Sequence, residues 1–211
     1  MAKILIADNF ALIREGIKKV LHSEPEITVV AETDHGGNVL RLVEKHKIDI
    51  VLLDINIPGM HGLDILKDLK KHFQNLPVLM LSMHPAQDYA LRSLKLGASG
   101  YLRKDSPTEE LVKAVQMIRT GGKYIPFALA EQLANWMAGN NGEESKHAAL
   151  SNREFDIMQQ LATGTTLKQI AETLNITVST ATTYKNRMYK KMGFSTNADL
   201  LRYCFKNNLI L

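Results

Sequence analysis

Residues 51–66 read VLLDINIPGMHGLDIL, a stretch in which three kinds of local pattern follow one another. An apolar run ends at Asp54, a turn segment with Pro58 and Gly62 follows, and apolar residues then recur at helical spacing. A run of Val, Ile and Leu without polar alternation is typical of a strand buried on both faces of a parallel sheet. The stretch therefore predicts a buried strand, a short loop and a helix, with Asp54 at the carboxyl end of the strand.

The alternation of strand and helix continues on both sides of this stretch. Segments with apolar residues at helical spacing separate further apolar runs, as in residues 12–21 and 111–118. Repeated strand–helix units of this kind predict a small open α/β sheet of parallel strands. The predicted strands are Ile4–Ala7, Ile27–Ala31, Ile50–Leu53, Val78–Leu81 and Gly100–Leu102.

Polar residues follow four of these strands, where ligands of open α/β sheets bind. Taken singly, each has an ordinary explanation, because Asp and Ser after a strand commonly form turns or caps and Lys is commonly a surface charge. Their joint occurrence indicates a site. Oxygen ligands without nearby Cys or His suit Mg²⁺, and an aspartate beside Mg²⁺ and Lys is a plausible nucleophile toward a phosphoryl group. The residues are Asp8, Asn9, Asp54, Ser82 and Lys104.

Composition excludes several classes of protein. The 211 residues carry a formal net charge of +4 and are 45% hydrophobic, which excludes wholesale disorder. A single cysteine, Cys204, excludes a disulfide scaffold and a multi-cysteine metal site. The sequence shows no signal peptide and no apolar stretch of about 18 residues, so we expect a cytoplasmic protein that does not cross a membrane.

The C-terminal residues predict a helical module. Ser151 and Glu154 have the spacing of a capping box at the start of a helix. A short second helix, a tight turn at residues 175–177 and a third helix over Thr177–Met192 form a predicted helix-turn-helix, and Asn197–Lys206 adds a fourth helix.

Charge indicates a polyanionic partner for this module. Residues 149–211 hold 8 basic and 4 acidic residues. Residues 177–193 contain Lys185, Arg187, Lys190 and Lys191 and no acid. Such a run favours nucleic-acid binding, although a solvated helix face has the same pattern.

The middle of the chain predicts a connector. Residues 119–126, RTGGKYIP, are rich in Gly, a helical stripe follows in residues 127–139, and residues 139–147, GNNGEESKH, are polar and typical of a flexible linker. We therefore expect one domain over residues 1–122, a linker with one helix over residues 123–148 and a second domain over residues 149–211.

Four motifs, ILIADN, VLLDINIPGMHGLDIL, VLMLSMH and GASGYLRKD, occur in an order that resembles the receiver domain of two-component response regulators. The resemblance covers residues 1 to about 122 and implies a flavodoxin-like fold with sheet order 2-1-3-4-5. It implies that Asp54 is the phosphoacceptor. The implied Mg²⁺ ligands are Asp8, Asn9, Asp54 and the backbone carbonyl of Asn56, and the implied switch residues are Ser82, Tyr101 and Lys104.

Residues 149–211 are similar to the DNA-binding domain of the LuxR type, so the whole chain resembles a response regulator of the NarL/FixJ type. By that resemblance Thr182, Thr183 and Asn186 face bases. Lys185 and Lys190 lie near phosphates.

The first strand departs from the receiver pattern. The family usually has two adjacent acids there, where this chain has Asp8 and Asn9, and it often has His-Pro where Phe10 and Ala11 stand. The replaced acid matches the usual direct metal ligand. Because Asn offers only a neutral oxygen, we expect weaker Mg²⁺ binding and slower phosphorylation.

These observations predict a transcription regulator rather than an enzyme. A sensor histidine kinase is expected to phosphorylate Asp54 with Mg²⁺, and the C-terminal domain to bind double-stranded DNA as part of a homodimer. Two alternatives stay open at this point. One is a metal-dependent phosphatase or phosphotransferase, which leaves the helix-turn-helix unexplained. The other is a DNA-binding regulator whose receiver is a phosphorylation-independent dimerisation module.

Overall fold

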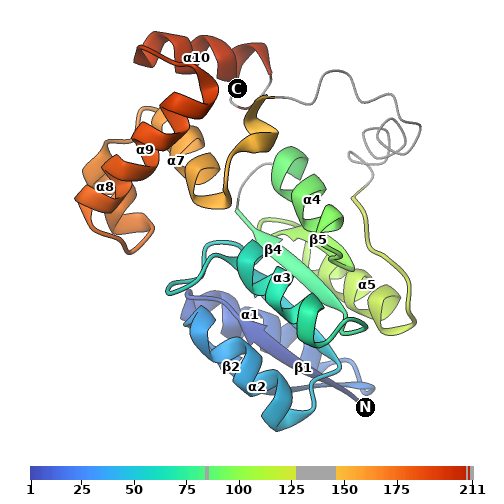
Figure 1. The fold of residues 1–211 in the computed structure, drawn as a ribbon. Coiled ribbons are helices and arrows are strands. Elements are labelled where there is room, and N and C mark those ends of the chain that lie inside the picture. The colour runs from blue at the N-terminus through green and yellow to red at the C-terminus, as the bar shows by residue number, and fades with distance from the viewer. Residues whose placement is uncertain (84–85, 127–145, 208, 210–211) are drawn as a thin grey trace. The chain divides into compact units, whose positions relative to one another are not determined.

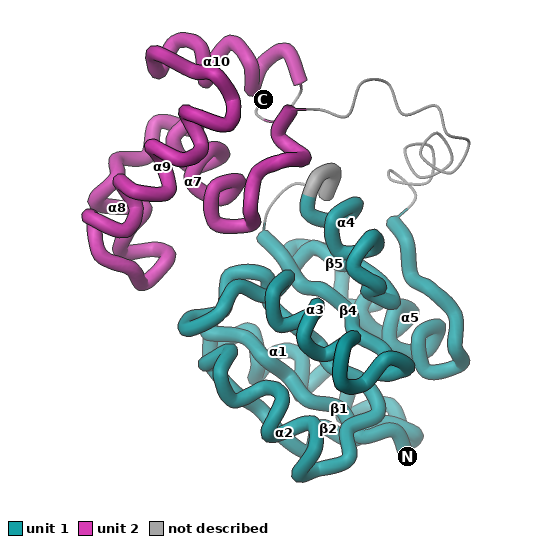
Figure 2. The backbone as a smooth tube through the Cα atoms, in the orientation of Figure 1, with its two compact units in different colours: residues 1–139 teal, residues 140–211 magenta. Residues whose placement is uncertain are grey.

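The computed structural model describes residues 1–83, 86–126, 146–207 and 209. The chain divides into two compact units, residues 1–139 and 140–211 (Figure 2). The helix predicted within residues 127–139 and nearly all of the polar linker lie outside the described residues, so the predicted domain boundaries stay predictions. Among the described helices, none has the length and apolar character needed to cross a membrane.

The first unit is built on a sheet of five parallel strands in the order β2-β1-β3-β4-β5, which confirms the predicted order (Figure 1). Four strands, β2 to β5, continue past their predicted apolar run into polar residues, because ladder hydrogen bonds use the backbone and tolerate any side chain but proline. The strands are β1 (Ala2–Ala7), β2 (Ile27–Thr33), β3 (Ile50–Asp54), β4 (Val78–Ser82) and β5 (Gly100–Arg103).

Helices cover both faces of this sheet, with α1 and α5 on one face and α2, α3 and α4 on the other (Figure 1). Alternate strand residues such as Ile4, Leu52 and Leu79 form one apolar core with α1 and α5. The helices are α1 (Ala11–His22), α2 (Val39–His46) after the short η1 (Gly36–Asn38), α3 (Gly62–His72), α4 (Ala86–Lys95) and α5 (Thr108–Arg119).

The second unit consists of helices with well-formed N-termini. The predicted capping box is present, since the Ser151 hydroxyl accepts the Glu154 N–H and the Glu154 carboxylate accepts the Ser151 N–H. Two further capping boxes, at Thr166 and Thr196, start later helices. The elements are η2 (Lys146–Ala149), α7 (Asn152–Ala162), α8 (Leu167–Thr173), α9 (Val178–Met192) and α10 (Asn197–Lys206).

Packing of the second unit includes a residue that the sequence assigns to the linker. His147 in η2 is buried, and its ring lies 5.8 Å from the Phe155 ring and 5.9 Å from the Tyr203 ring. The distance between His147 Nδ1 and the Tyr203 hydroxyl is 2.9 Å. The packed part of the second unit therefore extends at least to His147.

Candidate functional site

The carboxyl ends of the central strands bring the predicted polar residues together. Strand register keeps these ends level, with Ala7 opposite Leu53, Asp54 opposite Leu81, and Ser82 opposite Arg103. The Lys104 ammonium lies 2.7 Å from Asp8 Oδ2 and 3.0 Å from Asp54 Oδ2. All three side chains are almost completely buried. We call Asp8, Asp54 and Lys104 the acid–lysine cluster.

Two residues that the sequence did not single out hold this cluster. The Phe10 ring lies under the Lys104 ammonium, 5.3 Å from ring centroid to nitrogen, and the Phe10 N–H donates to Asp8 Oδ1 at 2.9 Å. The Arg14 guanidinium donates to the Asp8 carbonyl oxygen at 2.8 Å. For Phe10, the one available signal was its departure from the family's usual residue. Arg14 carried no signal in the sequence beyond its place in a predicted helix.

The loop after Asp54 has little room for a side chain at Gly62. A Cβ atom there would lie 2.3 Å from the Asp54 carbonyl oxygen, well inside contact distance. The Gly62 N–H donates to the Ile55 carbonyl at 2.8 Å, and the Ile55 N–H donates to the Leu81 carbonyl at 3.1 Å. Glycine at this position lets α3 begin directly against the backbone at the end of β3.

Burial and charge act on Asp54 in opposite directions. Burial raises the pKa of the Asp54 carboxyl, and the neighbouring Asp8 carboxylate raises it further. Attraction to the Lys104 ammonium and hydrogen bonds from Lys104 and the Asn56 N–H lower the pKa, and the net shift is upward. The Lys104 ammonium is thus the neighbour that most strongly opposes the upward shift in the pKa of Asp54.

Ser82 and Tyr101 lie side by side on β4 and β5 and are both buried. Burial raises the pKa of Tyr101 to about 12, against the opposing effect of its hydrogen bond with Ser82. The Ser82 carbonyl also accepts the Lys104 N–H at 2.8 Å. The three predicted switch residues are therefore linked to one another at one end of the sheet.

The oxygens of this edge fit a hard cation. Asn9 Oδ1 is buried and has no hydrogen-bond partner within the described part of the chain, and the Lys104 ammonium is the partner of Oδ2 in both Asp8 and Asp54. No cluster of three His, Cys, Asp or Glu side chains able to hold a metal occurs among the described residues. Mg²⁺ takes one or two carboxylates together with neutral oxygens and water, so two aspartates and Asn9 suit it better than they suit a softer metal.

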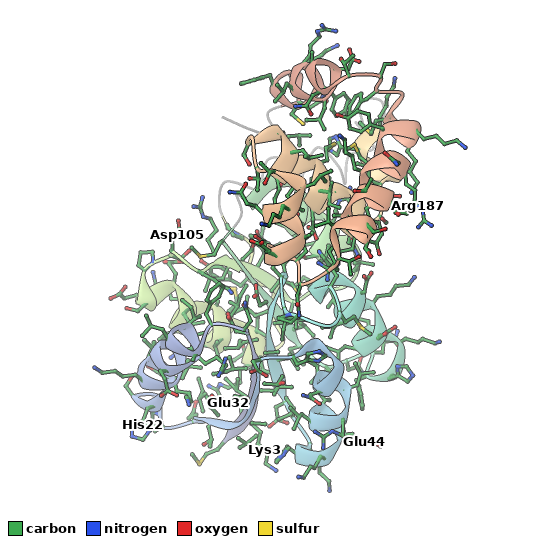
Figure 3. All side chains as sticks on the ribbon, turned by 90° about the vertical axis from the view of Figure 1, so that its left-hand side faces the viewer. Lys3, His22, Glu32, Glu44, Asp105 and Arg187 are labelled. Atoms are coloured by element: carbon green, nitrogen blue, oxygen red, sulfur yellow. The ribbon has the colours of Figure 1, made fainter. Side chains whose placement is uncertain are left out.

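The candidate DNA-reading surface lies on α9. Thr183, Asn186 and Lys190 are exposed and Thr182 is half-buried, all on the side opposite the buried Ala181, Met188 and Met192. Arg187, which the sequence analysis left without a contact role, is exposed on the same side (Figure 3). The Lys185 ammonium lies over the Tyr189 ring, 5.2 Å from its centroid.

One of the four cations in residues 177–193 has a counterion on another helix of the second unit. The cations of residues 177–193 are not all uncompensated, because the Lys191 ammonium lies 2.6 Å from the Glu154 carboxylate on α7. Although burial raises the pKa of Glu154, its bonds with Lys191 and Ser151 outweigh that effect and lower it. The acid that pairs with Lys191 lies 37 residues away in sequence, outside any local count of charge.

Comparison with known proteins agrees with both halves of this description. The family model described as response regulator receiver domain matches residues 4–116, and the model described as bacterial regulatory proteins, luxR family, matches residues 148–204. A transcriptional regulatory protein DegU of Brevibacillus brevis is 31% identical, over 99% of this chain and 94% of that protein. Transcriptional regulatory protein MctR of Rhizobium johnstonii is 33% identical, over 99% and 95%.

A solved structure shows a similar arrangement of elements. RcsB of Salmonella enterica serovar Typhimurium, solved on promoter DNA in the presence of the phosphomimetic BeF₃⁻, superposes with a TM-score of 0.63. The sequences are 26% identical, and the match covers 96% of this chain and 97% of that one.

Removal of the Lys104 ammonium tests the electrostatics of the cluster. In Lys104→Met the pKa of Asp54 should rise further, because burial and Asp8 remain. When the pKa of an acid is higher in the folded than in the unfolded protein, the folded protein loses stability as the pH rises from the unfolded-state pKa to the folded-state pKa. Relative to the parent chain, the free energy of unfolding should therefore fall as pH rises above about 4, by about 3–5 kcal/mol in total.

Urea unfolding followed by circular dichroism over a pH series measures this difference. The double variant Asp8→Asn/Lys104→Met is the control and should recover part of the loss, because one carboxylate no longer repels the other. Parallel pH profiles for the parent chain and Lys104→Met would show that Lys104 is not the counterion.

Proposed function

The chain belongs to the two-component response regulators of the NarL/FixJ type, and from that membership we propose that a sensor histidine kinase transfers a phosphoryl group to Asp54. The protein is a DNA-binding transcriptional regulator. The acid–lysine cluster is the observation that carries the proposal. It holds a buried carboxylate beside a second carboxylate and an ammonium at the open edge of the sheet.

Asp54 is the nucleophile in this proposal. One of its carboxylate oxygens attacks phosphorus, the bond from phosphorus to the donor nitrogen breaks, and an acyl phosphate remains on Asp54. Bound Mg²⁺, held by Asp8, Asn9, Asp54 and the Asn56 carbonyl, would supply charge neutralisation for the phosphoryl oxygens. Lys104 supplies further positive charge from inside the pocket, where low solvent exposure strengthens it.

The switch follows from the new charge. A phosphoryl group adds about −1.5 to −2 charges, which favours contacts with the Lys104 ammonium and the Ser82 hydroxyl. A Ser82 hydroxyl drawn to the phosphoryl group no longer bonds the Tyr101 hydroxyl. That change alters the packing of the β4 and β5 ends and of the helices that follow them.

The output is DNA binding by α9 in a homodimer. Thr182, Thr183 and Asn186 lie on its exposed side and are the proposed base contacts. Lys185 and Lys190 are the proposed phosphate contacts, and we add Arg187 because it is exposed between them and carries no ion pair among the described residues. The alternative of a receiver that acts only as a dimerisation module finds no support in these contacts.

Phosphorylation has a direct test at Asp54. Incubation with acetyl phosphate and Mg²⁺ should add one phosphoryl group to the chain, seen by intact-protein mass spectrometry, and none to Asp54→Asn. Asp64→Asn, a change to an exposed aspartate at the start of α3, is the matched control and should label normally. Equal labelling of Asp54→Asn and the parent chain would remove Asp54 from this role.

A second prediction concerns Asn9 as a proposed Mg²⁺ ligand of the same site. Asn9→Asp adds an anionic oxygen for a hard cation, so Mg²⁺ should bind at least several-fold more tightly in calorimetric titration and acetyl phosphate should label the variant faster. Asn38→Asp, at a half-buried asparagine before α2, is the control and should leave Mg²⁺ affinity unchanged. Unchanged or weaker affinity in Asn9→Asp would place Asn9 away from the metal.

Phosphate contacts on α9 predict a distinct salt response. Arg187→Ala or Lys190→Ala should weaken binding to random and to selected DNA alike. Each should also reduce the slope of log affinity against log salt by up to about 0.9 per lost contact. Lys206→Ala removes an exposed lysine of α10 as the control. Anisotropy titrations at several salt concentrations measure the slopes, and equal slopes for all variants would contradict the phosphate assignment.

A further inference from the structure

The N-terminal half of α9 presents methyl groups where a DNA-reading helix would be expected to present polar atoms. Val178, its first residue, is 48% exposed. Thr182 and Thr183 follow one turn later on the exposed side of the same helix. About half of the Val178 surface is open to solvent, so this apolar surface is available to a partner.

The threonine hydroxyls of this segment bond inside the helix. Thr182 Oγ1 donates to the Val178 carbonyl at 2.8 Å, and Thr183 Oγ1 donates to the Ser179 carbonyl at 3.0 Å. Thr177 and Thr180 share a hydroxyl–hydroxyl bond of 2.8 Å, and the Thr177 hydroxyl also accepts the Thr180 N–H. The hydroxyl protons of Thr182 and Thr183 are thus not available to a base. The other branch at each of these Cβ atoms is a methyl group.

Major-groove chemistry supplies a counterpart for these methyl groups. Thymine is the base that presents a C5-methyl group in the major groove, and it is recognised by apolar contact with residues such as threonine through its methyl. Asn186, exposed one turn further along α9, has the amide that pairs with the N6 and N7 atoms of adenine. A surface of methyl groups followed by an amide therefore matches T·A and A·T pairs.

We propose that Val178, Thr182 and Thr183 determine specificity by contacting thymine methyl groups, so that the protein prefers operators with thymines in the half-site. This inference rests on the proposed role of α9 in base reading. The inference concerns sequence specificity rather than overall DNA affinity, because it assigns the choice between bases to the C5-methyl group of thymine.

The decisive probe is DNA that lacks only that group. The full-length protein is first treated with acetyl phosphate and Mg²⁺ and then used to select duplexes from a random pool. The selected duplexes are resynthesised with deoxyuridine in place of thymidine at one position at a time. Each contacted position should lose about fourfold in affinity, the effect of burying one methylene-sized group. The affinity for random DNA should be the same whether that DNA contains thymidine or deoxyuridine.

Protein variants assign the effect to individual side chains. Thr182→Ser and Thr183→Ser keep the hydroxyl and remove the methyl group, so the preference for thymidine over deoxyuridine should fall from about fourfold to about one at one position each. Thr182→Val keeps methyl groups and removes the hydroxyl, and it should retain a preference for thymidine. Thr173→Ser on α8 is the matched control, because Thr173 is exposed and its hydroxyl makes the same kind of bond, to the Gln169 carbonyl at 2.9 Å.

Three results would overturn the inference, and they distinguish its failure from a failure of the proposed role of α9 in base reading. Sequence-selective binding that tolerates deoxyuridine at every position refutes thymine reading and leaves α9 as the reading helix. A deoxyuridine effect that survives both serine changes and also Val178→Ala assigns the methyl contact to another element. Failure to select any sequence from the pool, with the parent chain binding all DNA equally, refutes base reading by α9 and the inference with it.

Discussion

The contact of one buried ammonium with two buried carboxylates is the constraint around which the first unit is organised. Lys104 lies within 3.0 Å of both Asp8 and Asp54, at a depth where an unpaired charge would be strongly unfavourable. Two carboxyl groups share this pocket with one ammonium, and such a set of oxygens suits a further hard cation. The Phe10 ring and the Arg14 guanidinium hold the cluster from the α1 side. The ion pairs therefore act on the pKa of Asp54 as well as on its position.

The sheet makes such a cluster possible because its strands are apolar along both faces. Polar side chains within β1, β3 or β4 would be buried against helices, so they occur where the strands end. Parallel strands end at one edge, and register brings residues far apart in sequence to the same level. The close approach at Gly62 then starts α3 against the backbone of Asp54 at the end of β3. The fold thus delivers a fixed arrangement of charges with one open side.

In the second unit, several polar groups of α9 are already bonded within the domain, and this limits which groups can contact DNA. Lys191 pairs with Glu154, Lys185 lies over Tyr189, and the hydroxyls of Thr182 and Thr183 bond carbonyls of their own helix. The residues of α9 that stay exposed include Val178, Thr183, Asn186, Arg187 and Lys190. The role of a side chain therefore depends on the bonds it makes within its own domain. A threonine whose hydroxyl bonds its own helix still presents its methyl group, and a lysine can be the counterion of a carboxylate on a neighbouring helix.

The strand order was expected from the resemblance to receiver domains. The residues alone predicted the order of the elements, the capping box at Ser151 and the polar residues of the acid–lysine cluster. These features are local or periodic: apolar runs, helical spacing and cap spacing depend on neighbours in the chain. Only the tertiary structure decided which charges meet. Phe10 under Lys104, Arg14 on the Asp8 carbonyl, His147 against Phe155 and Lys191 on Glu154 join residues whose pairing no local pattern records. Distances between side chains are set by how helices and strands pack, and that packing is what makes two aspartates and a lysine one site.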